Sequence, residues 1–449
     1  MAKMHFFRGG FPALVIAPVI ALVIALVVSL SLPRLAHAVE IQKVTSPMGI
    51  EAWLVEDHTV PIIALDFSFE GGSTQDPEGK EGLTRLLAAT LDEGAGDLSS
   101  EDFQGQLEEL AVSINFSTGK DRFYGSLRTL TPTLPQAANL LALAVNEPRF
   151  DADAVERMKT RLSVRAKRNE SDPDAIAGRA LAGAMFGSHP YARTTLGTVA
   201  TLGGLTAEDL SAQHKKLLAR NGLTIGVVGA IDADTLKPLL DKVFAPLPEK
   251  SGLAEVADLA PQFGKEIHEE LAVPQTTILL GLPGLTRDDP DYQAAYVMNH
   301  ILGGGTFTSW MHEEVREKRG LSYGASTSLS PYRHTGLLLG SAATKADRAG
   351  ETVAIMLDQL RRMATDGPTE EELHSAKQFI TGSYPLRFDS SGKIARQLVA
   401  LQNSDLGIGY FDRRNSEIEA VTLDDVKRVA KRLLADKQPT IVTVGPKRG

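Results

Sequence analysis

The sequence predicts an α+β protein made of two duplicated, homologous domains, each a mostly antiparallel sheet with helices packed mainly on one face. Three observations support this prediction. The chain has 449 residues, which exceeds what a single hydrophobic core usually supports. Residues 205–229 align without a gap on residues 421–445. Between these two segments, residues 245–252 have the proline-rich and charged composition of a linker.

The aligned segments carry the clearest element predictions. They share ten identical residues in 25 positions, and each reads as a threonine N-cap, an amphipathic helix and a short β-branched strand. The N-caps are Thr206 and Thr422, and the strands end at Gly229 and Gly445. A separation of 216 residues indicates domain duplication, because solenoid repeats have much shorter periods.

Other elements support the duplication more loosely. Two alternating runs lead to glycines and predict strands, at residues 62–69 and 276–282. Two amphipathic runs that begin with proline and acids predict helices, at residues 148–162 and 368–380. We therefore place the domains at residues 39–245 and 262–449, joined by a linker at residues 246–261.

The N-terminus has the layout of a secretory signal peptide. Lys3 and Arg8 precede an apolar run over residues 11–32, and Ala36-His37-Ala38 follows as a cleavage site. We expect residues 1–38 to be removed after Ala38, leaving a periplasmic or secreted protein with no stable membrane span. The alternative is a retained anchor, because the apolar run approaches the length that spans a bilayer.

Composition excludes several classes of function. Apolar residues at 43% and charged residues at 23% are ordinary for a soluble globular protein. The net charge is −9, and removing the basic residues of the signal peptide, Lys3, Arg8 and Arg34, makes it −12. Such an acidic protein does not favour nucleic acid as a partner. The absence of cysteine excludes disulfides, thiolate metal sites and a cysteine nucleophile.

One stretch carries a family resemblance. Leu302-Gly303-Gly304-Gly305-Thr306-Phe307-Thr308-Ser309-Trp310 runs on through Glu314-Val315-Arg316-Glu317-Lys318-Arg319-Gly320-Leu321-Ser322-Tyr323. It resembles the C-terminal-half signature of pitrilysin/insulinase-type zinc peptidases, in the short two-domain form of bacteria and of mitochondrial processing peptidases. The resemblance covers essentially the whole mature chain. It implies the duplicated architecture predicted above and, in active members, a zinc ion held by an inverted His-x-x-Glu-His motif in the N-terminal half.

The metal ligands of that motif are missing from this chain. At the matching place the helix over residues 82–91 carries Arg85 and Ala89 at the ligand positions and Ala88 at the base position. The third ligand, a glutamate in the family, corresponds to Arg165. A hydrolytic zinc needs three protein ligands, and two arginines would repel the dication. We therefore expect the chain to bind no metal and to have no catalytic residues of its own.

Other catalytic patterns do not replace the missing site. None of the ten histidines forms His-x-x-x-His or His-x-x-Glu-His. Ser390-Ser391-Gly392-Lys393 matches Ser-x-x-Lys, but the usual companion motifs are absent, so we interpret it as a polar loop.

Arg316 and Tyr323 are the candidate substrate-binding residues. Residue chemistry alone favours a helix-end cation and a strand aromatic, because residues 308–318 read as a helix that ends at Gly320 before an extended segment at 321–329. The resemblance implies instead that this arginine and tyrosine bind the peptide near the scissile bond. Gly303–Gly305 is interpreted either as a close-approach segment beside the peptide chamber or as a plain turn.

The sequence thus predicts the non-zinc subunit of a periplasmic heteromeric metallopeptidase, inactive alone. A homologous partner subunit with His-x-x-Glu-His would carry the zinc, and this chain would complete the chamber for peptide substrates. The alternative is a non-catalytic scaffold or a peptide-binding chaperone without a proteolytic role. A self-sufficient protease is disfavoured by the missing ligands.

Overall fold

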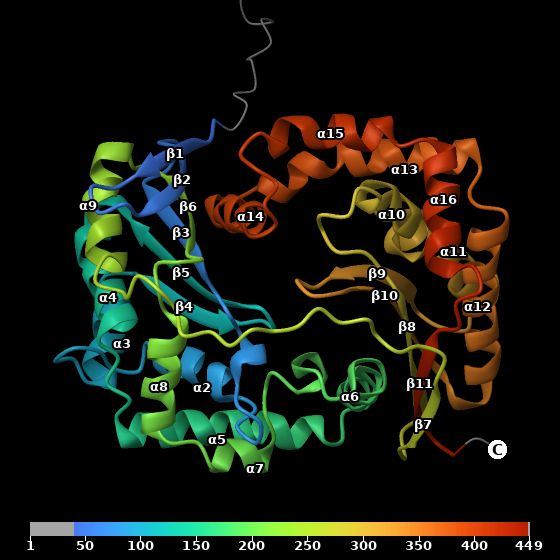
Figure 1. Cartoon of the computed structure of the whole chain (residues 1–449), viewed down its shortest axis with the longest axis horizontal. Helices are drawn as coiled ribbons and strands as arrows, with labels where there is room; N and C mark the ends of the chain where they lie inside the picture. Colours follow the sequence, from blue (N-terminus) through green and yellow to red (C-terminus); the bar gives the residue numbers. More distant parts are fainter. Residues whose placement is uncertain (1–39, 448–449) are drawn as a thin grey trace, which may run out of the picture. The chain divides into compact units, whose positions relative to one another are not determined.

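The computed structural model describes residues 40–447 (Figure 1), so the expected signal peptide at residues 1–38 lies outside the described part of the chain. The N-terminal half forms a six-stranded sheet in the order β1-β2-β6-β3-β5-β4. Its strands are β1 (Gln42–Thr45), β2 (Glu51–Glu56), β3 (Ile62–Glu70), β4 (Ser113–Thr118), β5 (Arg122–Leu130) and β6 (Thr224–Gly229).

The C-terminal half forms a five-stranded sheet with the same connectivity. Its strands are β7 (Glu266–Glu270), β8 (Gln275–Pro283), β9 (Ala325–Pro331), β10 (Gly336–Lys345) and β11 (Thr440–Gly445), in the order β7-β11-β8-β10-β9. This order repeats β2-β6-β3-β5-β4 strand for strand. β6 pairs parallel with β2 and antiparallel with β3, and β11 pairs in the same way with β7 and β8. The predicted duplication and the α+β fold class are confirmed.

The aligned segments form equivalent elements. α8 (Ala207–Leu217) precedes β6, and α16 (Leu423–Leu434) precedes β11. Thr206 caps α8 by accepting from the backbone N–H of Asp209, whose carboxylate accepts in turn from the N–H of Thr206. Thr422 and Asp425 form the same reciprocal pair at α16. Two orphan donors are satisfied at each helix start, which explains why the sequence pattern located these helices correctly.

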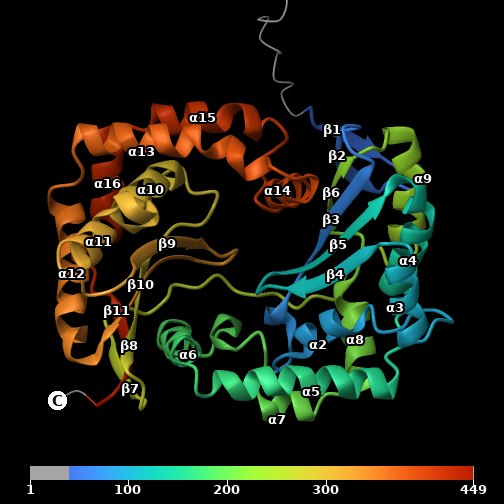
Figure 2. The same cartoon turned by 180° about the vertical axis from the view of Figure 1, so that it is seen from behind.

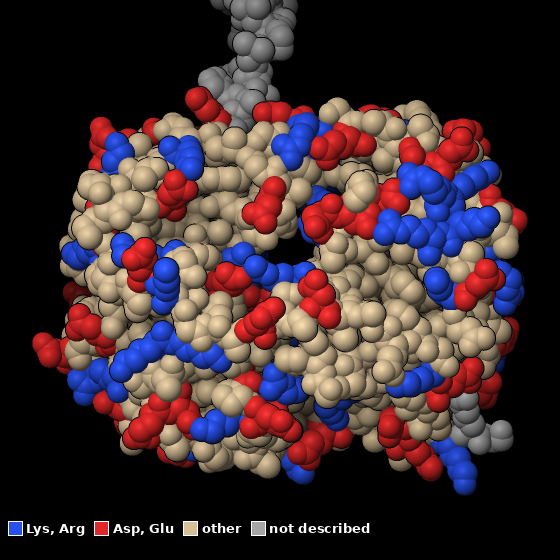
Figure 3. All heavy atoms as spheres, in the orientation of Figure 1, with Lys and Arg blue, Asp and Glu red and all other residues tan. Residues whose placement is uncertain are grey.

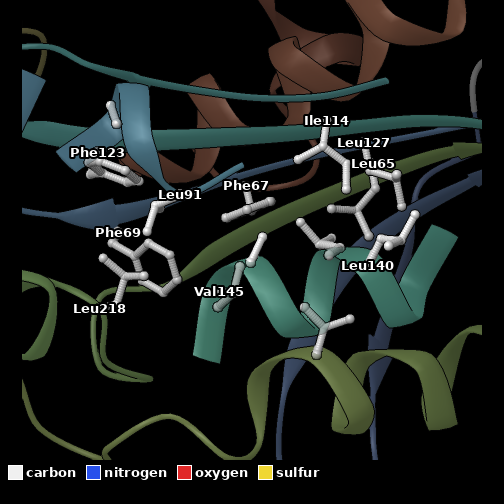
Figure 4. Close-up of a cluster of buried hydrophobic side chains, with 14 of the residues drawn as sticks. Leu65, Phe67, Phe69, Leu91, Ile114, Phe123, Leu127, Leu140, Val145 and Leu218 are labelled. Carbon is white, nitrogen blue, oxygen red and sulfur yellow. The ribbon is translucent and has the colours of Figure 1, made fainter. Parts of the chain in front are cut away.

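Helices cover one face of the first sheet and form its main core. Figure 4 shows this core, in which Phe67 of β3, Phe123 of β5 and Leu140 of α4 are buried. The remaining helices of this half are α2 (Leu83–Thr90), α3 (Ser100–Glu109), α4 (Leu134–Asn146), α5 (Ala152–Asn169), α6 (Pro173–Phe186), α7 (Val199–Gly203) and α9 (Ala233–Phe244). No helix or strand lies between Phe244 and Glu266.

The second sheet is covered on one face in the same manner. Leu338 of β10, Met356 of α12 and Val429 of α16 are fully buried in its core. The helices of this half, besides α16, are α10 (Tyr292–Asn299), α11 (Trp310–His312), α12 (Ala349–Thr365), α13 (Glu370–Gly382), α14 (Ser391–Asn403) and α15 (Tyr410–Ala420). Figure 2 shows the same arrangement from behind.

The two halves exchange one helix each. α6 of the N-terminal half packs on β8 and β11 of the second sheet, and α14 of the C-terminal half packs on β3 and β6 of the first. Both contacts require a glycine on the strand, because a side chain there would clash with the helix. A Cβ on Gly226 of β6 would lie 2.6 Å from the carbonyl oxygen of Ala395, and one on Gly281 of β8 would lie 2.3 Å from Sδ of Met185. The otherwise open face of each sheet is thus covered by the other half.

Three local details differ from the sequence prediction. Residues 390–393, interpreted as a polar loop, form the N-cap and the first turn of α14, which begins at Ser391. The helix expected over residues 308–318 is assembled from a short 3-10 turn, α11 and a π-helical turn at Glu313–Glu317. The following strand begins at Ala325 instead of Leu321, because residues 321–324 first leave the helix end through Gly320, whose φ is +58°. In the part of the chain that the structure describes, no helix is long and apolar enough to cross a membrane.

Candidate functional site

The helix that would carry the metal motif is present as α2, with its apolar face buried. Leu83, Leu86 and Leu87 are at most 2% exposed. Ala88, at the position of the general base, is also buried, whereas Arg85 and Ala89 at the two ligand positions are half-buried. The helix expected to carry the motif is therefore present, but the side chains at its expected ligand positions cannot hold zinc.

Three arginines gather at the position of the missing metal. Burial, together with the charges of Arg165 and Arg161 on α5, lowers the pKa of Arg85. Within residues 40–447, none of the three makes a hydrogen bond or an ion pair. Alanines and cations offer no donor that zinc accepts, so the residues present do not fit the metal. No group of three or more histidine, aspartate and glutamate side chains that could hold a metal ion occurs among the described residues.

A buried carboxylate caps the start of α2. Asp76 accepts hydrogen bonds from the backbone N–H of Gly82 at 3.0 Å and of Thr84 at 2.9 Å, and from the hydroxyl of Thr84 at 2.5 Å. Asp76 is 3% exposed, and burial raises its pKa to about 6 against the opposing effect of these bonds. Negative charge at a helix N-terminus is favourable, so the geometry of α2 does not depend on a bound ion.

Arg316 lies on the π-helical turn, where its guanidinium is already engaged. Nη1 hydrogen-bonds Nε2 of His312 at 3.0 Å, and Nε lies 3.6 Å from Oε1 of Glu317. The guanidinium also sits 5.5 Å from the ring centre of Phe307, itself 69% exposed. Sequence reasoning missed His312 and Phe307, although both belong to the glycine-rich stretch that carries the family resemblance.

Tyr323 lies in the segment between α11 and β9 and projects into solvent. It is 90% exposed, and no described residue makes a hydrogen bond or ring contact with it. The structure does not bring Arg316 and Tyr323 into contact with one another. Their assignment as substrate-binding residues stays a prediction.

Buried polar groups surround the glycine-rich segment. Gly303 packs so closely on β9 that a Cβ would lie 2.4 Å from the backbone nitrogen of Thr327, and a Cβ on Gly304 would lie 2.6 Å from Nδ2 of Asn299. Oγ1 of Thr327, Oδ1 of Asn299 and Nδ1 of His312 are buried without a hydrogen-bond partner among the described residues. Unpaired buried polar atoms are costly, and π-helical turns often mark functional sites.

A cavity of about 1030 Å³ is lined by both halves of the chain. Its walls come from β3, β4 and β5, from α14, and from the segments at residues 286–288 and 331–333. The charged lining residues are Asp66, Glu70, Asp121, Asp288, Asp405, Arg122, Arg287, Arg333 and Arg396. Figure 3 shows that this face of the molecule is hollowed near its middle, with acidic and basic side chains around the hollow. Arg316, Tyr323 and Arg85 do not line this cavity.

Polar contacts at the cavity and beside it tie the two halves together. Nη1 of Arg333 lies 2.5 Å from Oε1 of Glu70, and the backbone N–H of His334 donates to the hydroxyl of Tyr191 at 3.2 Å. Tyr191 is fully buried beneath α6, and its hydroxyl donates to the carboxylate of Asp121. The cavity wall is thus held by buried contacts as well as by surface ion pairs.

A duplicated α+β fold with a helix that lacks its metal ligands defines the class of this protein as a non-catalytic relative of zinc peptidases. The comparisons agree with this class. Residues 52–199 match the family model of insulinase (peptidase family M16), and residues 204–380 match that of the peptidase M16 inactive domain. The chain therefore belongs to the insulinase family of peptidases, M16.

Individual relatives span most of the chain. The non-peptidase homolog YmxG of Helicobacter pylori is 27% identical over 78% of this chain and 80% of its own length. An uncharacterized zinc protease of Streptomyces coelicolor is also 27% identical, over 84% of this chain and 83% of its own. A solved peptidase M16 inactive domain from Pseudomonas fluorescens is 29% identical, with a TM-score of 0.86 over 91% of this chain and 98% of its own.

Proposed function

We propose that this chain is the non-zinc subunit of a periplasmic heteromeric metallopeptidase. One observation carries the proposal: arginines and alanines stand at the expected ligand positions, while a cavity of about 1030 Å³ with a polar lining is retained between the two halves of the chain. A family member that had lost all function would have no need of such a cavity. A subunit that holds peptide for a homologous partner needs the cavity and not the metal.

The edge strand β4 provides a place for an extended peptide. β4 is the last strand of the first sheet, so its outer backbone groups have no neighbouring strand. Asn115 and Ser117 of β4 line the cavity, and α2 packs against the same strand. An extended peptide can add to such an edge through main-chain hydrogen bonds, which bind without regard to sequence. The substrates would accordingly be unfolded peptides that enter the cavity.

The partner subunit would supply the zinc, its His-x-x-Glu-His motif and its general base. In this arrangement Arg316 and Tyr323 act on the same peptide across the interface. A guanidinium offers several fixed donors to peptide carbonyls, and an exposed phenol can donate to an oxygen that becomes negatively charged. The full exposure of Tyr323 leaves its hydroxyl free for such a role.

A second candidate is a peptide-binding or scaffolding protein without a proteolytic role. The observation that favours it is the position of the pair: Arg316 is bound to His312, and both Arg316 and Tyr323 lie outside the cavity lining. In that case the cavity would still bind peptide, and no zinc-bearing partner would be required.

Reconstitution separates the two candidates. The chain is mixed with the homologous protein of the same organism that carries His-x-x-Glu-His, and hydrolysis of a fluorescence-quenched unfolded peptide is measured for each chain and for the mixture. The control is a partner whose motif glutamate is replaced by glutamine, which should bind but not cleave. Activity that needs both chains supports the heteromeric peptidase. A partner that is equally active without this chain favours the scaffold.

Export is the second part of the proposal. The arrangement of Lys3, Arg8, the apolar run and Ala36-His37-Ala38 supports cleavage after Ala38. N-terminal sequencing of the protein from an extracytoplasmic fraction should begin at Val39. A membrane-bound protein that still carries residues 11–32 would favour the retained anchor instead.

A further inference from the structure

A second cavity, of about 200 Å³, lies entirely within the C-terminal half. It is enclosed by α10, α14 and α15 and by the short turn at Tyr384–Phe388. Its lining residues are Arg287, Tyr292, Gln293, Tyr296, Tyr384, Arg387, Gln397, Ala400, Leu401, Ser404, Leu406, Tyr410 and Arg414. Arg287, Ala400 and Ser404 also line the larger cavity, so the two spaces adjoin.

The lining holds three arginines and no acid. None of Arg287, Arg387 and Arg414 forms an ion pair with a carboxylate anywhere in residues 40–447. Arg287 donates to the hydroxyl of Tyr410 at 2.6 Å, and Arg387 donates to that of Tyr296 at 3.3 Å. Phenols neutralise no charge, so the side chains that line this pocket carry a net positive charge. The carboxylate of Glu417 lies behind this lining, where it accepts from Nε2 of Gln293 at 2.9 Å.

Of the three arginines, Arg414 has the greatest need of a hydrogen-bond acceptor, because only 5% of it is exposed. Its guanidinium stacks over the ring of Tyr384 at 3.9 Å, and only Nη1 makes hydrogen bonds, to the carbonyl of Ile380 and the side chain of Asn415. No described residue accepts a hydrogen bond from its Nε or Nη2. A buried guanidinium without an anion carries a desolvation penalty that a bound anion would offset.

Tyr384 adds a second unsatisfied group to the same pocket. Its side chain is 7% exposed, and its hydroxyl is buried with no hydrogen-bond partner among the described residues. A phenol and a guanidinium together present convergent donors, and oxyanions accept several hydrogen bonds at once. Two nine-tenths-buried donors in one acid-free cavity point to a missing acceptor.

We propose that this pocket, lined by Arg287, Arg387, Arg414 and Tyr384, binds an oxyanion. Planar carboxylate and tetrahedral phosphate share the chemistry that the donors require. The adjoining cavity suggests the source: resting on the proposed peptide-binding function, the group is the C-terminal carboxylate of a peptide that occupies the larger cavity. A volume of about 200 Å³ admits such an end group with a few waters, but not a whole peptide.

Binding is tested by calorimetry on the purified chain at constant ionic strength. The probes are inorganic phosphate and two versions of one short unstructured peptide, with a free or an amidated C-terminus. We expect the free carboxylate to bind about tenfold to a hundredfold more tightly than the amide, as a hydrogen-bonded charge pair would give. We also expect phosphate to compete with the free carboxylate.

Two variants link the effect to the pocket. Tyr384→Phe removes only the unpartnered hydroxyl, and Arg387→Gln removes an exposed member of the arginine set, so neither should disturb folding. Each should reduce the preference for the carboxylate by about fivefold or more. Arg361→Gln is the matched control, because it makes the same charge change on the exposed face of α12, outside the pocket.

The outcomes separate this inference from the proposed function. Phosphate binding that Tyr384→Phe and Arg387→Gln weaken, with no binding of either peptide, supports the oxyanion pocket with a small free anion as its ligand and overturns peptide binding. Equal binding of both peptides, with phosphate affinity unchanged in both variants, overturns the pocket and leaves peptide binding standing. A chain that binds neither phosphate nor peptide overturns both.

Discussion

Arg85 of α2 and Arg165 of α5 lie on two helices that pack together, and burial together with the positive charge of Arg165 lowers the pKa of Arg85. The family resemblance matches these residues to two zinc ligands of active members. The replacement therefore does more than remove donors: it places like charges where a dication would sit. α2, which carries Arg85, keeps its buried leucine face, and Asp76 accepts a hydrogen bond from the backbone N–H of Thr84 at its start.

Replacing Arg85 by methionine should relieve this repulsion while keeping a long, helix-favouring side chain. We expect the free energy of unfolding to rise by up to about 1 kcal/mol at low ionic strength, and the difference from wild type to shrink as salt screens the charges. Urea unfolding at low and high salt measures both effects. Arg361→Met on α12 is the control, since Arg361 pairs with Asp358. A loss of stability at both salt concentrations would contradict the expected repulsion.

Asp76 should make folding stability depend on pH. Burial raises its pKa to about 6, so between about pH 4 and pH 6 the folded state binds more protons than the unfolded state. The contribution of Asp76 to stability is therefore greatest at acid pH and is lost as pH rises through 6. Asp76→Asn removes this titration, so the stability of the variant relative to wild type should increase by roughly 1–3 kcal/mol over that range. Denaturant unfolding at several pH values measures the difference, and a constant difference would contradict the assignment.

The exchanged helix α14 gives a prediction about packing. Gly226→Ala places a methyl group 2.6 Å from the carbonyl of Ala395, and backbone cannot yield easily, so we expect a loss of about 1–3 kcal/mol. Gly183→Ala on α6, with open space at its Cβ, should instead gain about 0.4–1 kcal/mol. Because α14 also lines the larger cavity, Gly226→Ala should weaken peptide binding as well. Equal thermal stability of the two variants would argue against close packing of α14 on β6.

The duplication and the repeated caps could be predicted from the sequence because they rest on local chemistry. Thr206 with Asp209 and Thr422 with Asp425 form their hydrogen bonds within one helical turn. The loss of the metal ligands could be predicted for a similar reason, because each expected ligand position is a single residue whose identity the sequence states directly. Each of these features depends on residues that are near one another in the chain.

The exchange of α6 and α14 and the oxyanion pocket could not be predicted in this way. Gly226 and Gly281 look like ordinary strand glycines until the helix of the other half is placed against them. Arg287 lies 97 residues before Tyr384 and 127 residues before Arg414. No local pattern connects the three, and only packing of α10, α14 and α15 brings them together. The π-helical turn that binds Arg316 to His312 reads in the sequence as a plain helix.

Arg316→Ala and Tyr323→Phe should each slow hydrolysis by the reconstituted complex without dissociating it. Loss of one oxyanion-type donor costs about 10²–10³ in kcat, which is the effect expected for Tyr323→Phe. Arg316→Ala should also raise KM, because it removes a peptide anchor. Steady-state kinetics and size-exclusion chromatography of the complex measure both. Arg319→Ala is the control, since Arg319 is paired with Glu314 one turn away. If both variants kept wild-type activity, Arg316 and Tyr323 would be a helix-end cation and an exposed aromatic with no role in hydrolysis.

The central claim is that this chain carries no catalytic zinc, and elemental analysis of the purified protein tests it most directly. We predict less than stoichiometric zinc and no chelator-sensitive hydrolysis of unfolded peptide by the chain alone, because Arg85, Ala88, Ala89 and Arg165 provide neither ligands nor a base. A tightly held zinc ion in every chain, together with hydrolysis that a chelator abolishes, would contradict the account.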